Sequence, residues 1–196
     1  MSFKKRLISL YSIIYVKKIR IINFLIPNFF CKNRISFKSI PYCEQKTLIT
    51  GKGKVEIGKN SKFGLKLGGF YRNGCIELQS RNINSIIKIG NDVKTNNNLF
   101  ICACNYIEIG DAVLIGQNVT IMDFEAHGIE PSKRNQMGEI ESVIISENVW
   151  IGNNVTILKG SMVGKNSIIA AGAIVKGVFP ENVIIGGIPA KIIKQI

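Results

Sequence analysis

A six-residue repeat with an aliphatic residue at its first position is the feature that most constrains this chain. Within residues 107 to 178 it appears as Ile109-Gly110-Asp111-Ala112-Val113-Leu114 and again as Ile115-Gly116-Gln117-Asn118-Val119-Thr120. The first positions are Ile109, Ile115 and Ile121 and, after a break, Ile145, Ile151, Ile157, Val163, Ile169 and Val175. A repeat this regular predicts a solenoid, in which each coil packs on its neighbours.

The period of six indicates the shape of one coil. Each unit can hold a short strand and a turn, so three units would close a triangular coil of about eighteen residues. Strands of successive coils would pair in parallel, with the aliphatic residues stacked inside and small residues at the corners. Weaker copies at 55–60 and 87–93 extend the pattern toward the N-terminus, and residues 68–74 are expected to form a loop. We therefore predict an all-β solenoid, a parallel β-helix.

One segment, from Asp123 to Ser142, interrupts the repeat, and it carries the only histidine of the chain, His127. The phase of the aliphatic positions is the same before and after this segment, because Ile121 and Ile145 are separated by a whole number of six-residue periods. We therefore expect a loop that leaves the solenoid, presents His127, and returns without disturbing the core.

The first forty residues are basic and apolar. No acidic residue precedes Glu44, and the net charge of the chain is +13. The apolar runs 7–16 and 21–30 are too short to span a bilayer, and no cleavage pattern of a secretory signal follows them. We predict a helical segment over 1–45 and a β-helix domain over 46–196. Residues 1–40 either contact an anionic membrane surface peripherally or pack as an arm on the protein itself, and no nucleic acid is expected.

Five cysteines occur, at positions 31, 43, 75, 102 and 104. An odd number without a secretory signal favours free, buried thiols in a reducing compartment. We therefore expect a cytoplasmic protein, either free or peripheral at the inner face of the membrane. Cys102 and Cys104 alone make a poor zinc site, because no second Cys or His pair accompanies them. No metal is therefore predicted.

Four features resemble the hexapeptide-repeat acyltransferases, in particular their sugar, maltose and galactoside O-acetyltransferase branch. They are the repeat over 50–178, its break at His127, the segment Glu147-Asn148-Val149-Trp150-Ile151-Gly152, and Gly187-Ile188-Pro189-Ala190-Lys191. The resemblance implies a left-handed parallel β-helix with an active-site loop at 123–142 and a C-terminal cap at 179–196. It further implies a homotrimer with active sites between subunits, acetyl-CoA as co-substrate, and a saccharide or glycan as acceptor.

Acyl transfer from a thioester to a hydroxyl needs a base, oxyanion donors and a groove that aligns the reactants. An imidazole titrates near neutral pH, and His127 also matches the catalytic histidine of the family. A carboxylate or a carbonyl usually orients such a base. Among the nearby acids we favour Asp123 and Glu139 over Glu125. No serine or cysteine stands in a nucleophile context, so direct transfer is the simpler mechanism.

The resemblance also assigns binding residues. Coenzyme A would contact residues of the late coils and the C-terminal tail: Trp150, Asn153, Ala171, Lys176, Lys191 and Lys194. Lysines suit its phosphates as point charges. Here Lys176-Gly177 replaces the Thr-Lys usual in the branch, so this contact is expected to differ. Asn96 and Asn98 are the candidates for contacts with the acceptor.

We therefore expect an acetyl-CoA-dependent O-acetyltransferase that acts on a saccharide hydroxyl in bacterial surface polysaccharide biosynthesis. The alternative is an N-acetyltransferase acting on a nucleotide-linked amino sugar. A zinc hydratase on the same fold would need three imidazoles at one site, which a single histidine per chain does not readily supply. A non-catalytic solenoid would have no reason to combine the loop histidine with the terminal Pro-Ala-Lys.

Overall fold

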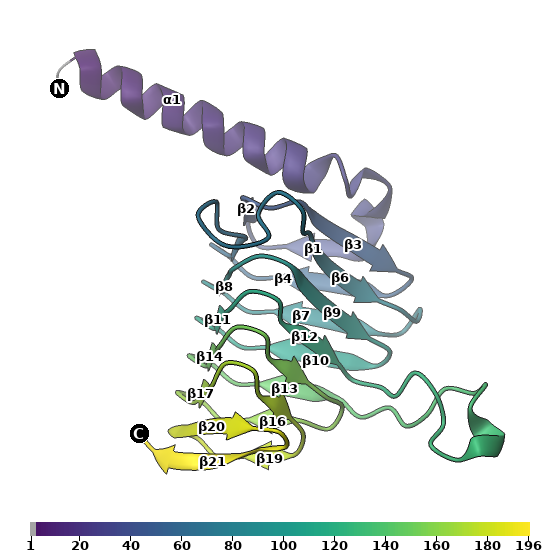
Figure 1. Ribbon diagram of the computed structural model, residues 1–196. Helices are drawn as coiled ribbons and strands as arrows, with labels where there is room; N and C mark the ends of the chain where they lie inside the picture. Colours follow the sequence, from purple (N-terminus) through teal and green to yellow (C-terminus); the bar gives the residue numbers. More distant parts are fainter. Residues whose placement is uncertain (1–2) are drawn as a thin grey trace.

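The computed structural model describes residues 3–196 as a parallel β-helix with one long helix at its N-terminal end (Figure 1). Consecutive strands pass from one sheet to the next, so that every coil contributes to all three sheets. The sheets, named A, B and C, have the orders β1-β4-β7-β10-β13-β16-β19, β2-β5-β8-β11-β14-β17-β20-β21 and β3-β6-β9-β12-β15-β18. All pairs are parallel except β20 with β21, and the predicted all-β solenoid is confirmed.

The strands are short, as a six-residue unit requires. Sheet A contains β1 (Ile35–Phe37), β4 (Lys54–Ile57), β7 (Ile86–Ile89), β10 (Tyr106–Ile109), β13 (Val143–Ile145), β16 (Met162–Val163) and β19 (Val178–Phe179). Sheet B contains β2 (Tyr42–Cys43), β5 (Lys62–Phe63), β8 (Lys94–Thr95), β11 (Leu114–Ile115), β14 (Trp150–Ile151), β17 (Ile168–Ile169), β20 (Val183–Gly187) and β21 (Ala190–Gln195). Sheet C contains β3 (Thr47–Gly51), β6 (Ile76–Ser80), β9 (Leu99–Ala103), β12 (Thr120–Met122), β15 (Thr156–Ile157) and β18 (Ile174–Val175).

The first position of each repeat forms the core. Ile109 pairs in register with Ile89 and Ile145, and Ile121 pairs with Ile101 and Ile157, so that buried side chains stack from coil to coil. Burying an isoleucine side chain contributes about 1.5–3 kcal/mol, and this contribution recurs in every coil. The six-residue repeat therefore specifies which side chains stack in the core.

Asparagines form the corners. Asn118 and Asn154 have φ values of 56° and 57°, in the left-handed region that asparagine tolerates better than most residues. The side-chain Nδ2 of Asn118 also donates to Oδ1 of Asn154 at 2.9 Å, and Nδ2 of Asn98 donates to Oδ1 of Asn118 at 3.1 Å. These ladders explain why asparagine is abundant in a β protein.

The inserted segment projects from the corner between β12 in sheet C and β13 in sheet A (Figure 1). Its two arms are antiparallel: Glu125 N–H donates to the Glu139 carbonyl at 2.9 Å, and Gly138 N–H donates to the Glu125 carbonyl at 3.0 Å. A short 3₁₀ turn, η3 (Pro131–Lys133), lies near its tip. Ile121 and Ile145 are both fully buried, so the loop leaves and rejoins the core in phase, as predicted.

The N-terminal end consists of α1 (Phe3–Arg20), a π-helical turn η1 (Ile21–Leu25) and a 3₁₀ turn η2 (Phe29–Arg34). Phe24 is buried in the core cluster, and the Asn28 side chain bonds to the backbone of Thr47 and Ile49 at 2.8 and 2.6 Å. This end therefore covers the first coil. None of the helices in residues 3–196 is long and apolar enough to cross a bilayer.

The boundaries differ from those expected at both ends. Strands β1 and β2 lie within the segment 1–45, and β19 and β20 continue the coil into the segment 179–196. These strands have two to five residues, and β1 and β2 lack the regular repeat around them. Only β21 turns back, antiparallel to β20, and covers the last coil.

Candidate active site

Asp123 anchors the loop where it leaves the solenoid. Its side chain has no exposed surface, and its carboxylate accepts backbone N–H bonds from Cys104, Asn105 and Tyr106 at 2.7, 2.7 and 2.8 Å. These three amides form the turn between β9 and β10. The carboxylate is thus engaged with the coil below and is not brought to His127, so the expected role in orienting the imidazole is not supported.

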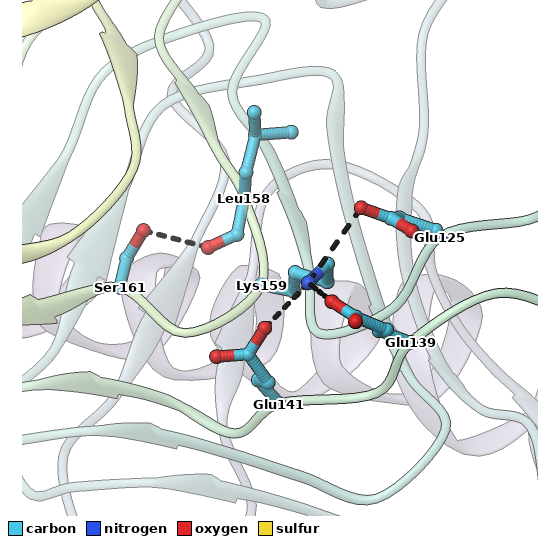
Figure 2. A network of polar contacts seen from close by, with 6 residues as sticks. All are labelled: Glu125, Glu139, Glu141, Leu158, Lys159 and Ser161. Carbon is cyan, nitrogen blue, oxygen red and sulfur yellow. Dashed lines mark hydrogen bonds and ion pairs between the residues drawn. The ribbon is translucent and has the colours of Figure 1, made fainter. Parts of the chain in front are cut away.

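Lys159 holds the two arms of the loop together (Figure 2). Its side chain is 4% exposed, and its Nζ donates to Glu139 Oε2 at 2.7 Å and to Glu141 Oε1. Glu125, on the outgoing arm, lies 3.6 Å away. The Lys159 hydrogen bond lowers the pKa of Glu139, and the bonds to Glu139 and Glu141 raise the pKa of Lys159.

Glu139 therefore serves as a loop anchor, and among the described residues no hydrogen bond or ion pair joins its carboxylate to the imidazole. Sequence reasoning missed Lys159, which reads as an ordinary surface lysine after Leu158. The sequence signal for the role of Lys159 is the cluster of glutamates where the loop leaves and rejoins the solenoid.

His127 is exposed on the outgoing arm, and a backbone carbonyl orients it. Its Nδ1 lies 2.7 Å from the carbonyl oxygen of Arg134, across the tip of the loop. A carbonyl oxygen can only accept, so Nδ1 donates, and the neutral ring carries its lone pair on Nε2. This tautomer can accept a proton at Nε2, as a general base must.

A groove lies on the outer face of sheet B. It has a volume of about 340 Å³ and is lined by Lys62, Gly64, Leu65, Lys94, Thr95, Asn96, Leu114, Ile115, Gly116, Trp150 and Asn153. Trp150 is 54% exposed there, and Asn153 Oδ1 is held by the N–H of Gln117 at 2.9 Å. The structure thus brings together Asn96, Trp150 and Asn153, which the sequence had assigned separately to acceptor and cofactor. We call this feature the sheet-B groove.

The remaining predicted residues lie elsewhere. Ala171 is one coil beyond Asn153 at the same corner, since Gly172 N–H donates to the Asn153 carbonyl at 2.9 Å. Lys176 follows β18 at the loop corner, where its charge helps to lower the pKa of Glu139. Lys191 and Lys194 are exposed on β21. Asn98 belongs to the corner ladder and does not line the sheet-B groove.

The loop and the sheet-B groove face different directions. The loop leaves the corner between sheets C and A, and in a three-sided solenoid this corner lies opposite sheet B. In Figure 1 the loop projects to the right, whereas β8, β11 and β14 lie at the left. His127 and the groove of one chain therefore cannot form one site.

Comparison with known proteins assigns the family. Residues 142–177 match the model of the bacterial transferase hexapeptide (six repeats). WbbJ of Escherichia coli K12, assigned to lipopolysaccharide biosynthesis as an O-acetyl transferase, is 30% identical over 174 residues, which cover 83% of this chain and 82% of WbbJ. The chain belongs to the hexapeptide-repeat acetyltransferases. It is therefore an acyltransferase, as predicted.

Two further acetyltransferases match over a shorter stretch or by fold. Galactoside O-acetyltransferase of Escherichia coli K12 is 40% identical over 114 residues, 57% of this chain and 55% of that enzyme. The crystal structure of the polySia-specific acetyltransferase NeuO superposes with a TM-score of 0.65 at 24% identity, over 82% of this chain and 66% of NeuO. The left-handed parallel β-helix predicted from the sequence is the fold that these acetyltransferases share.

Proposed function

We propose that this acetyltransferase transfers an acetyl group from acetyl-CoA to a hydroxyl of a saccharide, in the synthesis of a bacterial surface polysaccharide. The bond between His127 Nδ1 and the Arg134 carbonyl carries the proposal, because it leaves Nε2 as the basic nitrogen on an exposed loop. WbbJ and galactoside O-acetyltransferase, both named as O-acetyl transferases, support an oxygen acceptor.

The chemistry is direct transfer. Nε2 of His127 removes the hydroxyl proton as the oxygen attacks the thioester carbonyl carbon, which gives a tetrahedral intermediate. Collapse of this intermediate breaks the carbon–sulfur bond and releases the thiolate of coenzyme A. The imidazolium then returns its proton to the leaving sulfur, so the histidine ends the cycle neutral.

A homotrimer with cyclic symmetry would bring His127 of one chain to the sheet-B groove of the next. The opposed directions of loop and groove support this arrangement. Asn96 would contact the acceptor, and Trp150 and Asn153 would border the thioester and the pantetheine arm. Farther from the reaction, Ala171 would offer backbone groups to that arm. The phosphates of coenzyme A would meet Lys191 and Lys194 on β21 of the chain that supplies the groove, and Lys176 at the loop corner of the neighbouring chain.

The test is a screen of saccharide acceptors with acetyl-CoA, read by mass spectrometry, for the parent chain and for His127→Ala. Loss of a general base should lower the rate with hydroxyl acceptors about 10²–10⁴-fold. A thermal melt checks that the exposed substitution leaves the fold intact. Full activity of His127→Ala on hydroxyl acceptors would refute the role of the base. Acetylation of amino sugars alone would instead establish the N-acetyltransferase alternative.

We also propose that α1 rests on the anionic inner face of the membrane. Tyr11, Ile13 and Ile14 are exposed on α1, and Lys17 and Lys18 lie in its last turn. Apolar and basic side chains on one exposed helix favour the interface of an anionic bilayer. The chain should sediment with phosphatidylserine vesicles at low salt but not with phosphatidylcholine vesicles.

The matched variants are Lys17→Glu/Lys18→Glu on α1 and Lys52→Glu/Lys59→Glu on the solenoid, all at exposed positions. The first pair should abolish sedimentation with anionic vesicles, whereas the second should weaken it little. Equal effects of both pairs would mean that overall charge, and not α1, directs the binding.

A further inference from the structure

Two lysines stand side by side on sheet B without an internal partner. Lys62 of β5 and Lys94 of β8 are direct register partners, and both side chains are exposed. Neighbouring strands lie about 4.8 Å apart, and like charges directly opposite each other are destabilising. In residues 3–196, neither lysine takes part in an ion pair. An external anion would relieve this repulsion.

The two lysines also connect two hollows of the surface. They line the N-terminal end of the sheet-B groove, and they line a second hollow of about 390 Å³ together with Arg20, Tyr42, Asn60, Ser61 and Asp92. Nε of Arg20 is buried without a hydrogen-bond partner, and the single carboxylate, Asp92, accepts a bond from Asn60 Nδ2 at 3.1 Å. Three cations therefore face one acid around the second hollow.

We propose that Lys62 and Lys94 bind the anionic group of the acceptor, which is a saccharide that carries phosphate or carboxylate groups. This inference rests on the proposed function. Leu114 lies in register between Lys94 and Trp150, so the lysine and the tryptophan are two strands, or about 10 Å, apart along the sheet. A sugar held beside Trp150 would thus place a neighbouring diphosphate or uronic-acid group over the lysine pair.

Lysine suits this role because its compact charge needs no fixed geometry and can serve either phosphate or carboxylate. Arg20, at the end of α1, lies beyond the pair and would meet a second negative charge of a diphosphate. The anionic end of the acceptor would then point toward the end of the solenoid that bears α1.

The kinetic test compares the parent, Lys62→Gln/Lys94→Gln, and the control Lys52→Gln, an exposed lysine at another corner. The readout is the ratio of kcat/KM for an anionic acceptor to that for the matching neutral sugar. One arm uses a nucleoside-diphosphate sugar, and the other uses a uronic-acid oligosaccharide. Loss of two exposed charge pairs should lower the preference of the double variant about tenfold, and Lys52→Gln should keep the parental ratio.

The arm that shows the preference identifies the source of the anion. A parent that acetylates sugars with the same ratio as the double variant would overturn the inference and leave the proposed function standing. A parent that acetylates no saccharide would overturn the proposed function. In that case the anion site would be tested by titrating the protein with inorganic pyrophosphate and following the fluorescence of Trp150, the only tryptophan. A saturable change in the parent that weakens about tenfold in the double variant supports the site, and no change refutes it.

Discussion

Replacing Asp123 with alanine should destabilise the solenoid at the base of the loop by several kcal/mol. The change removes the acceptor of three backbone N–H bonds of 2.7–2.8 Å, and the side chain that makes them is fully buried. Hydrogen bonds to a charged group contribute about 1.5–3 kcal/mol each. Because the amides of Asn105 and Tyr106 are only partly buried and can gain water, the lower end applies to them. We expect a total loss of about 4.5–6 kcal/mol.

Urea unfolding followed by circular dichroism measures this loss. With a slope of about 2 kcal/mol per molar urea, the midpoint should fall by about 2.2–3 M. Glu147→Ala is the control, since it removes an exposed carboxylate for which no hydrogen bond or ion pair is described, and its effect should stay within about 0.5 kcal/mol. A loss below about 1 kcal/mol for Asp123→Ala would show that the carboxylate does not hold the turn.

Three further results are expected. Lys159→Met should lower kcat/KM about ten- to a hundredfold by misplacing His127. It should also speed tryptic cleavage of the loop. The control Lys165→Met, which breaks an exposed ion pair, should change neither kcat/KM nor the rate of cleavage. The pKa of Glu139 is lowered in the folded chain, so its ion pair is complete above the ordinary value of about 4.3 and is lost as the pH falls through the lowered pKa. The hydrogen-exchange protection factors of the loop amides should fall there. Burial raises the pKa of Cys102 to about 11, so this thiol should resist alkylation at pH 8 until the chain is unfolded.

The repeat predicts the fold because it is local. Each six-residue unit contains its own core residue and its own corner, so Ile109 or Asn118 can be assigned without knowledge of distant contacts. The ends were harder to predict, since β1 and β2 have two or three residues and are held in place by pairing with strands of the next coil. Their boundaries depend on pairing partners about twenty residues away, which no local pattern marks.

The site was predictable only in part, for the same physical reason. His127 stands out because it is the only imidazole and lies in the one break of the regular repeat over 107–178. Its orienting group is the backbone carbonyl of Arg134. Any residue at that position would provide a carbonyl, so the sequence does not identify this partner. Asp123 looked like a partner of His127, but it bonds to amides 17 to 19 residues earlier in the chain. Only the register of the coils reveals such contacts.

Recombination of two inactive variants tests most directly whether each active site is shared between chains. One variant is His127→Ala, and the other, Asn96→Ala/Trp150→Ala, alters the sheet-B groove. Each should be inactive alone. In a random mixture of trimers from equal co-expression, about one interface in four would combine an intact histidine with an intact groove of the next chain. Activity should then recover to about a quarter of the parental value, whereas no recovery in demonstrated hybrids would contradict a site shared between chains.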